Sequence, residues 1–134
     1  MSSGHCLPKQ ERLVSRRLME TLFSGSQSVA AFPLRAVYII KERTHGEEPV
    51  QLLISVSKKH FHHAVDRNRV KRQVREAYRH NKSLIYPALS EKQQLLLAVI
   101  WLSDMQTSTT KVEKRLTSLL RRIAEKLPVE TLNA

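Results

Sequence analysis

The sequence predicts an α/β fold, in which a small β-sheet is packed by helices as a two-layer α+β sandwich. Two stretches have the apolar spacing of amphipathic helices, and three runs are rich in the β-branched and aromatic residues that favour strands. A predicted helix separates the second run from the third, so we expect a β-α-β unit. The length of 134 residues suits one domain with a single core.

The N-terminal part of the chain is expected to hold one short helix. Residues 1–8 combine turn-forming side chains with no period, which predicts a flexible lead. A helix follows from Ser15 to Gly25, because glycine suits the left-handed position after a helix. The residues of its buried face are Leu18, Met19, Leu22 and Phe23. Residues 26–33 are small and turn-forming, and Pro33 stands where a strand could begin.

Three strands are predicted in the rest of the chain. The first two are Leu34–Ile40 and Val50–Val56, and the polar break between them predicts a β-hairpin. The third, Leu95–Trp101, is almost continuously apolar. Such a run is typical of an interior strand with both faces covered.

The stretch between the second and third strands predicts an amphipathic helix with two opposite faces. One face is an apolar stripe directed toward the core, made of Val70, Val74, Ala77 and Tyr78. The other carries the donor side chains Asn68, Lys71, Arg72, Arg75 and Arg79. Asp66 is the predicted N-cap. Charges four residues apart rise by about 6 Å, which is close to the spacing of neighbouring phosphates, so we expect a polyanionic partner.

The last helix is predicted from the capping box that begins at Thr110 and ends at Glu113. Its apolar stripe is Val112, Leu116, Leu119, Leu120, Ile123 and Leu127. We expect Pro128 to end the helix. These limits predict a single domain over residues 9–128 and a C-terminal tail over residues 129–134.

The charge of the chain favours a nucleic-acid partner over a membrane. Lys and Arg number 23 against 12 acidic residues, and the net charge is +11. The excess is concentrated between Lys58 and Lys82, as nucleic-acid binding requires. The single Cys6 fits a reducing compartment, and no apolar run is long enough to span a bilayer. We therefore expect a cytoplasmic protein without a membrane contact.

Catalysis by side chains of the protein has little support in the sequence. His60, His62 and His63 lie close together, but no further ligand stands at a suitable spacing for a metal. The carboxylates are scattered and do not resemble a two-metal nuclease. We predict no catalytic residue and no metal or other cofactor bound by the protein alone.

The basic helix carries a family resemblance. Residues 67–79 read Arg-Asn-Arg-Val-Lys-Arg-Gln-Val-Arg-Glu-Ala-Tyr-Arg, preceded by Ser-Val-Ser-Lys-Lys at 55–59 and Ala-Val at 64–65. This pattern resembles the RNR signature of the bacterial ribonuclease P protein subunit, and the resemblance extends over roughly residues 9–127. The chain departs from the family pattern at His60–His63, where the loop has no glycine and one residue more.

The resemblance implies both the fold and the function. It implies a ribosomal-protein-like fold with a left-handed β-α-β crossover, and a non-catalytic protein subunit of the endoribonuclease ribonuclease P. In that family the RNA subunit, with Mg²⁺, hydrolyses the phosphodiester bond that releases the 5′ leader from precursor tRNA. The implied partners are therefore ribonuclease P RNA and precursor tRNA, with no obligate protein partner.

The site residues follow by matching the family pattern. The resemblance implies that RNA is bound by Lys58, Lys59, Arg67, Asn68, Arg69, Lys71, Arg72, Arg75 and Arg79. For a cleft that holds the leader between the sheet and the first helix, we choose Phe23 and Tyr38, because an aromatic face stacks on any base. A single aromatic at such a spacing is also typical of a core, so both interpretations of these two residues stay open.

Two other functions are weighed against this one. The alternative is a ribosomal or RNA-chaperone-like binding module without an associated enzyme. A DNA-binding helix-turn-helix is disfavoured, because the basic helix is followed by a strand and has no short helix and tight turn before it. Restoration of precursor-tRNA cleavage at low Mg²⁺ by the purified protein and ribonuclease P RNA would separate the first two.

Overall fold

A computed structural model describes residue 20 and residues 27–44, 46 and 48–133, with the side chains of the last helix described as far as residue 127. In chain order the elements are β1 (Gln27–Ala31), β2 (Leu34–Glu42), β3 (Val50–Ser55), α2 (Ala64–Asn81), η3 (Lys82–Leu84), η4 (Tyr86–Ala88), β4 (Gln93–Trp101) and α3 (Thr109–Asn133). The predicted first helix, including Phe23, lies outside the described residues. No helix in the described ranges combines the length and apolar character needed to cross a membrane.

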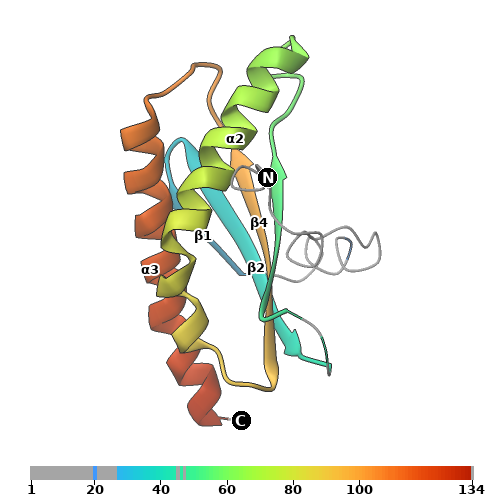
Figure 1. The fold of residues 1–134 in the computed structure, drawn as a ribbon, viewed down its shortest axis with the longest axis vertical. Coiled ribbons are helices and arrows are strands. Elements are labelled where there is room, and N and C mark those ends of the chain that lie inside the picture. The colour runs from blue at the N-terminus through green and yellow to red at the C-terminus, as the bar shows by residue number, and fades with distance from the viewer. Residues whose placement is uncertain (1–19, 21–26, 45, 47, 134) are drawn as a thin grey trace, which may run out of the picture.

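The described strands form one mixed sheet in the order β1-β2-β4-β3 (Figure 1). β4 pairs antiparallel with β2 and parallel with β3, so α2 joins two neighbouring parallel strands. This confirms the predicted β-α-β unit and the interior position of β4. The predicted hairpin between β2 and β3 is wrong, because β4 lies between them. β4 is the most apolar strand and takes the interior position of the sheet. β2 and β3, which are neighbours in the sequence, therefore pair with β4 and not with each other.

The actual partner of β2 on its other side is β1, which the sequence did not predict. β1 and β2 pair antiparallel from Gln27↔Tyr38 to Ala31↔Leu34, and Phe32 and Pro33 form the turn between them. Small residues such as Ser28, Ala30 and Ala31 have weak strand preference. β1 forms because these residues pair with the edge of β2.

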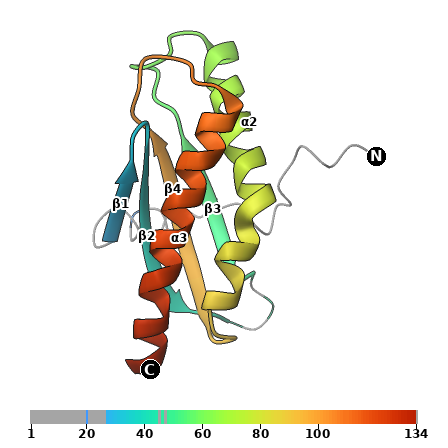
Figure 2. The same ribbon diagram turned by 90° about the vertical axis from the view of Figure 1, so that its left-hand side faces the viewer.

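Helices α2 and α3 lie side by side over one face of the sheet (Figure 2). Between them and the sheet lies the main core, which includes the whole predicted stripe of each helix. Val70, Val74 and Tyr78 are 0% exposed, and so are Leu116 and Leu120. The helical periodicity therefore predicted both faces correctly, and the charged side of α2 is directed away from the core.

The ends of both helices differ from the predictions. α2 begins at Ala64, with His63 in the N-cap position, so Asp66 is an acidic residue of the first turn. The negative charge of Asp66 in the first turn interacts favourably with the helix dipole, but its side chain does not cap the helix. α3 begins at Thr109, where Ser108 Oγ accepts from the backbone N–H of Lys111 at 3.3 Å and replaces the predicted capping box.

α3 also extends past its predicted end. It continues through Pro128 to Asn133, so the predicted tail begins inside a helix. Proline removes one hydrogen bond of the helix, but its φ of about −65° is itself helical.

Candidate nucleic-acid interface

The outward face of α2 presents the predicted RNA-binding residues in two settings. Asn68, Arg69 and Arg72 are exposed, whereas Lys71 and Arg75 are half-buried along the opposite flank of the helix. α2 contains two acidic residues, Asp66 and Glu76. Most of these positive charges are therefore not neutralised within the helix, and the face remains suited to a polyanion.

Beside this face, an open groove of about 580 Å³ separates the first half of α2 from the start of α3. Its lining residues are Val65, Asn68, Arg69, Arg72, Gln73 and Thr109. Val65 is 77% exposed, so an apolar surface lies between two arginines and an asparagine. Such a groove combines apolar contact for a sugar or base with guanidinium groups that bind phosphate oxygens in bidentate geometry.

Gln73 fixes the wall of this groove. It is 7% exposed, and its Nε2 donates to the backbone oxygen of Thr107 at 2.9 Å and to Thr109 Oγ1 at 3.2 Å. A backbone carbonyl can only accept, so the amide orientation is determined. Gln73 thereby ties α2 to the segment that leads into α3 and sets the width of the groove.

The turn after β3 presents Lys58 and Lys59, both exposed, beyond the first turn of α2. Phe61 anchors this loop, because its side chain is 7% exposed and belongs to the main core. The Arg67 guanidinium donates from Nη1 to the backbone oxygens of Phe61 at 2.9 Å and His62 at 3.1 Å. Arg67 therefore holds the loop, and its remaining donors are available to a ligand.

A second contact closes the same loop from the other side. His60 Nδ1 lies 2.6 Å from Asp104 Oδ1, in the segment between β4 and α3. In place of the usual glycine turn of the RNR pattern, this chain thus has a histidine-rich loop held by a buried phenylalanine and a polar bridge.

The C-terminal half of α2 is less basic than its first half. Arg79 Nη2 lies 3.6 Å from Glu76 Oε1, and His80 lies between Glu76 at 3.9 Å and Glu113 at 4.0 Å. These distances place Arg79 in an ion pair with its own helix. The uncompensated charge is concentrated toward the N-terminal half.

Tyr38 requires a correction. Its side chain is 1% exposed, lies in the core beneath α2 and α3, and its hydroxyl donates to Gln27 Oε1 at 3.1 Å. A ring buried this deeply has no face for a base, so the core interpretation holds and the stacking role of Tyr38 is wrong. The cause is the pleat, because neighbouring residues of a strand point to opposite faces.

The other face of the sheet is the one that α2 and α3 leave uncovered (Figure 2). Its centre is apolar, with Val37, Leu96 and Ala98 buried and Ile39, Leu53 and Ile100 partly buried. The register places these side chains in rows across β2, β4 and β3. Arg35 is exposed at one end of this face.

Val65, Gln73 and Thr109 are the site residues that the sequence did not predict. The sequence could have identified Val65 and Gln73, because each breaks the pattern of an amphipathic helix. Val65 is an apolar residue on the charged side, and Gln73 is a polar residue beside Val70 and Val74. Thr109 carried none, since its place depends on how α3 packs beside α2.

The chemistry of the interface is binding. The described residues contain no group of three or more His, Cys, Asp or Glu side chains placed to hold a metal ion. Cationic side chains, an apolar contact and a hydroxyl in an open groove can position a nucleic-acid backbone.

Comparison with known proteins agrees with this geometry. A family model described as ribonuclease P matches residues 7–124. The ribonuclease P protein component of Porphyromonas gingivalis strain ATCC 33277 is 40% identical over 127 residues, which cover 94% of this chain and 92% of that protein.

Solved structures show the same arrangement. The ribonuclease P protein from Thermotoga maritima superimposes with a TM-score of 0.64 at 28% identity, covering 84% of this chain and 96% of that one. A Staphylococcus aureus ribonuclease P protein mutant with defective mRNA degradation activity gives a TM-score of 0.68 at 25% identity, covering 87% and 90%.

Proposed function

The chain belongs to the bacterial ribonuclease P protein family and is the protein subunit of this tRNA-processing endonuclease, and on that premise we propose that the outward face of α2 binds ribonuclease P RNA. The proposed contacts are Lys58, Lys59, Arg67, Asn68, Arg69, Lys71, Arg72, Arg75 and Arg79. The observation that carries the proposal is the groove in which Arg69 and Arg72 flank the exposed Val65. The competing ribosomal or chaperone-like function has no such support from the relatives.

The same premise supports a second surface for the 5′ leader of precursor tRNA. We place it on the sheet face opposite α2 and α3, where the partly buried Ile39 replaces Tyr38 as the β2 residue of the cleft. Phe23 remains a proposed member of this cleft and lies outside the described residues. Exposed Arg35 at the end of the face is suited to a leader phosphate.

Cleavage is assigned to the RNA subunit. In this proposal the Mg²⁺ of the holoenzyme is bound mainly by RNA, and the protein holds no ion by itself. The residues of the α2 face contribute binding and orientation, since cationic donors can position phosphates but cannot activate water. The family likeness also supports a left-handed β3-α2-β4 crossover, one domain over residues 9–128 and a cytoplasmic location.

Reconstitution with ribonuclease P RNA tests the proposal. We expect the purified protein to restore precursor-tRNA cleavage at low Mg²⁺, and the Arg69→Gln/Arg72→Gln variant to need more protein for the same rate. Its binding should also show a log K versus log[salt] slope that is flatter by about two, one unit for each lost phosphate contact. Lys92→Gln, at an exposed turn before β4, is the control. Unchanged affinity and slope in the double variant would refute the α2 interface.

A further inference from the structure

The outward face of α3 carries charge that the proposed function does not use. Opposite its buried stripe lie Lys111, Lys114, Arg115, Arg121, Arg122 and Lys126, all exposed. Within residues 109–127 of this helix the only acidic residues are Glu113 and Glu125. A helix whose apolar side is already buried does not need an excess of positive charge for folding, because the charges on a solvated helix face usually alternate in sign.

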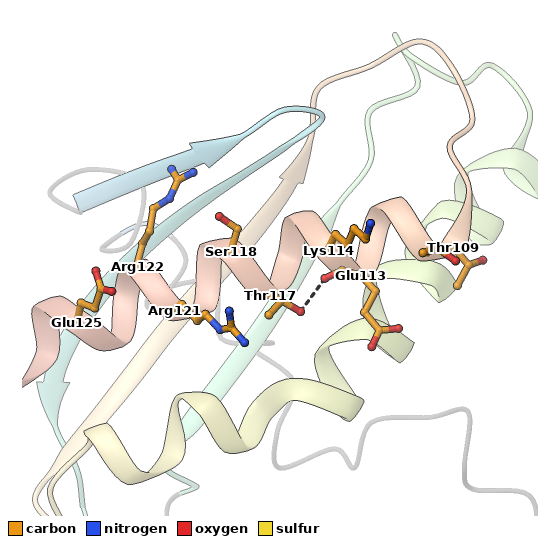
Figure 3. A pocket seen from close by; sticks show the side chains of 9 residues that line it. Thr109, Glu113, Lys114, Thr117, Ser118, Arg121, Arg122 and Glu125 are labelled. Atoms are coloured by element: carbon orange, nitrogen blue, oxygen red, sulfur yellow. Dashed lines mark hydrogen bonds between the residues drawn. The ribbon is translucent and has the colours of Figure 1, made fainter.

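This face is hollowed along its length. An open groove of about 730 Å³ is lined by nine side chains, Thr109, Thr110, Glu113, Lys114, Thr117, Ser118, Arg121, Arg122 and Glu125 (Figure 3). None of them is apolar, so the groove offers no anchor for a hydrophobic peptide or a lipid tail. The lining consists of cations, hydroxyls and two carboxylates.

The groove on α3 adjoins the groove beside α2 at Thr109. Thr109 lines both of them, and Thr110 and Lys114 also line a third hollow of about 480 Å³ with Ser108, Lys111 and Arg115. These shared residues place the two grooves next to each other, so a strand bound by Arg69 and Arg72 lies close to the groove on α3. The surface continues past Thr109 onto the cations of α3.

Several groups in the groove already have fixed positions. Glu113 Oε2 accepts from Asn81 Nδ2 at 3.3 Å, which holds this carboxylate toward α2. Arg122 Nη1 donates to the backbone oxygen of Ala30 at 2.6 Å, and Figure 3 shows its guanidinium directed toward β1. Lys114 and Arg121 are exposed and have no hydrogen-bond or ion-pair partner within the described residues. They are the cations most available to a ligand.

We propose that the outward face of α3 is a second RNA-binding surface, which continues the α2 groove across Thr109 and holds the phosphodiester backbone of a bound RNA strand. This inference rests on the proposed function of α2. Lys114 and Arg121 are seven residues apart and rise by about 10 Å, so with neighbouring phosphates about 6 Å apart their side chains can reach phosphates two positions apart along a strand. Thr117 and Ser118 lie between them and place hydroxyls where phosphate oxygens or ribose 2′-hydroxyls can be bound.

The test compares two double variants of equal charge change. Lys114→Gln/Arg121→Gln removes the two available cations of the groove, and Arg43→Gln/Lys92→Gln removes two cations outside every proposed RNA surface. Equilibrium binding to ribonuclease P RNA, with and without precursor tRNA, is measured over a series of salt concentrations. We expect the groove variant to bind roughly two- to thirtyfold more weakly and to flatten the log K versus log[salt] slope by about two, while the control changes little.

The outcomes separate this inference from the proposed function. If Arg69→Gln/Arg72→Gln weakens binding and Lys114→Gln/Arg121→Gln behaves like its control, the α3 surface is overturned and the α2 interface stands. If only the α3 variant weakens binding, the proposed function of α2 fails instead. Equal losses in the α3 variant and its control overturn the inference too, because net charge alone would then explain them.

A tethered cleavage reagent gives a readout that does not depend on affinity. An iron chelate attached to Ser118→Cys, in a Cys6→Ser background, should cleave the bound RNA at nucleotides next to those cleaved from an α2 position such as Asn68→Cys. No cleavage from position 118 in a complex that is cleaved from position 68 would overturn the proposal. Circular dichroism melting confirms that each variant is folded.

Discussion

Replacing Tyr38 by alanine tests the division between the core and the two proposed RNA surfaces. The ring is 1% exposed, and loss of a buried aromatic side chain costs about 3–5 kcal/mol. With 134 residues and an unfolding entropy of about 2.1 cal/mol/K per residue, the entropy at the midpoint is about 0.28 kcal/mol/K. The melting temperature should therefore fall by about 11–18 °C. Tyr38→Phe keeps the ring and removes the hydroxyl that donates to Gln27, which predicts a fall of about 2–5 °C in the melting temperature.

The assay pairs thermal denaturation with substrate discrimination by the reconstituted holoenzyme. At a temperature where circular dichroism shows Tyr38→Ala to be folded, its preference for precursor over mature tRNA should equal that of the wild type. Ile39→Ala, on the opposite face of the sheet, should lower that preference with a smaller loss of stability, because this side chain is only partly buried. A Tyr38→Ala variant with an unchanged melting temperature and a lost precursor preference would refute the core assignment.

Three further tests, with five substitutions, examine the packing of the helices and loops by thermal denaturation. Val74→Asp should unfold the protein, because it buries an unpaired carboxylate at a position with 0% exposure, whereas Arg75→Ala should cost at most about 0.5 kcal/mol; equal melting temperatures would contradict the helix phase. Phe61→Ala should cost about 3–5 kcal/mol and His60→Ala less than about 1 kcal/mol, since Asp104 opposite His60 is 77% exposed; the reverse order would make the polar bridge the anchor of the loop. Ser108→Ala should cost about 1 kcal/mol by removing the cap of α3, and no loss would disprove that cap.

The features that the sequence predicted correctly are those that depend on local periodicity. The stripe of α2 follows from the positions of Val70, Val74 and Ala77 alone, because side chains three or four residues apart share a face whatever the helix packs against. The same reasoning assigned the basic residues of α2 to solvent. The apolar run of β4 likewise predicted an interior strand without any knowledge of its neighbours.

The predictions that were wrong concern features that depend on contacts between distant parts of the chain. β2 and β3 are adjacent in sequence, yet each pairs with β4, and only comparing the burial of all strands could have revealed this. The face to which Tyr38 points is set by the register of β2 against β4, in which Tyr38 lies opposite Leu97. A shift of one residue would have turned Tyr38 to the other face of the sheet, so composition alone could not decide which face it occupies. The predicted helix ends were wrong because Ser108 caps α3, and His63 occupies the N-cap position of α2, from loops whose paths are fixed by tertiary contacts.

The arrangement of the core explains how one small domain can offer separate surfaces to RNA. The helix-covered face of the sheet is filled by large side chains such as Trp101, Tyr38 and Tyr78, which tie α2, α3 and the strands into one rigid unit. The charged side of α2 and the face of the sheet that α2 and α3 do not cover consequently lie on opposite sides of that core (Figure 2). Neither surface shares a side chain with the other, so a ligand on one can be held without rearranging the other. A subunit that binds and orients RNA depends on this fixed geometry more than on the strength of any single contact. The reason is that a reaction between positioned groups slows sharply when the distance between the reacting atoms changes by about 1 Å.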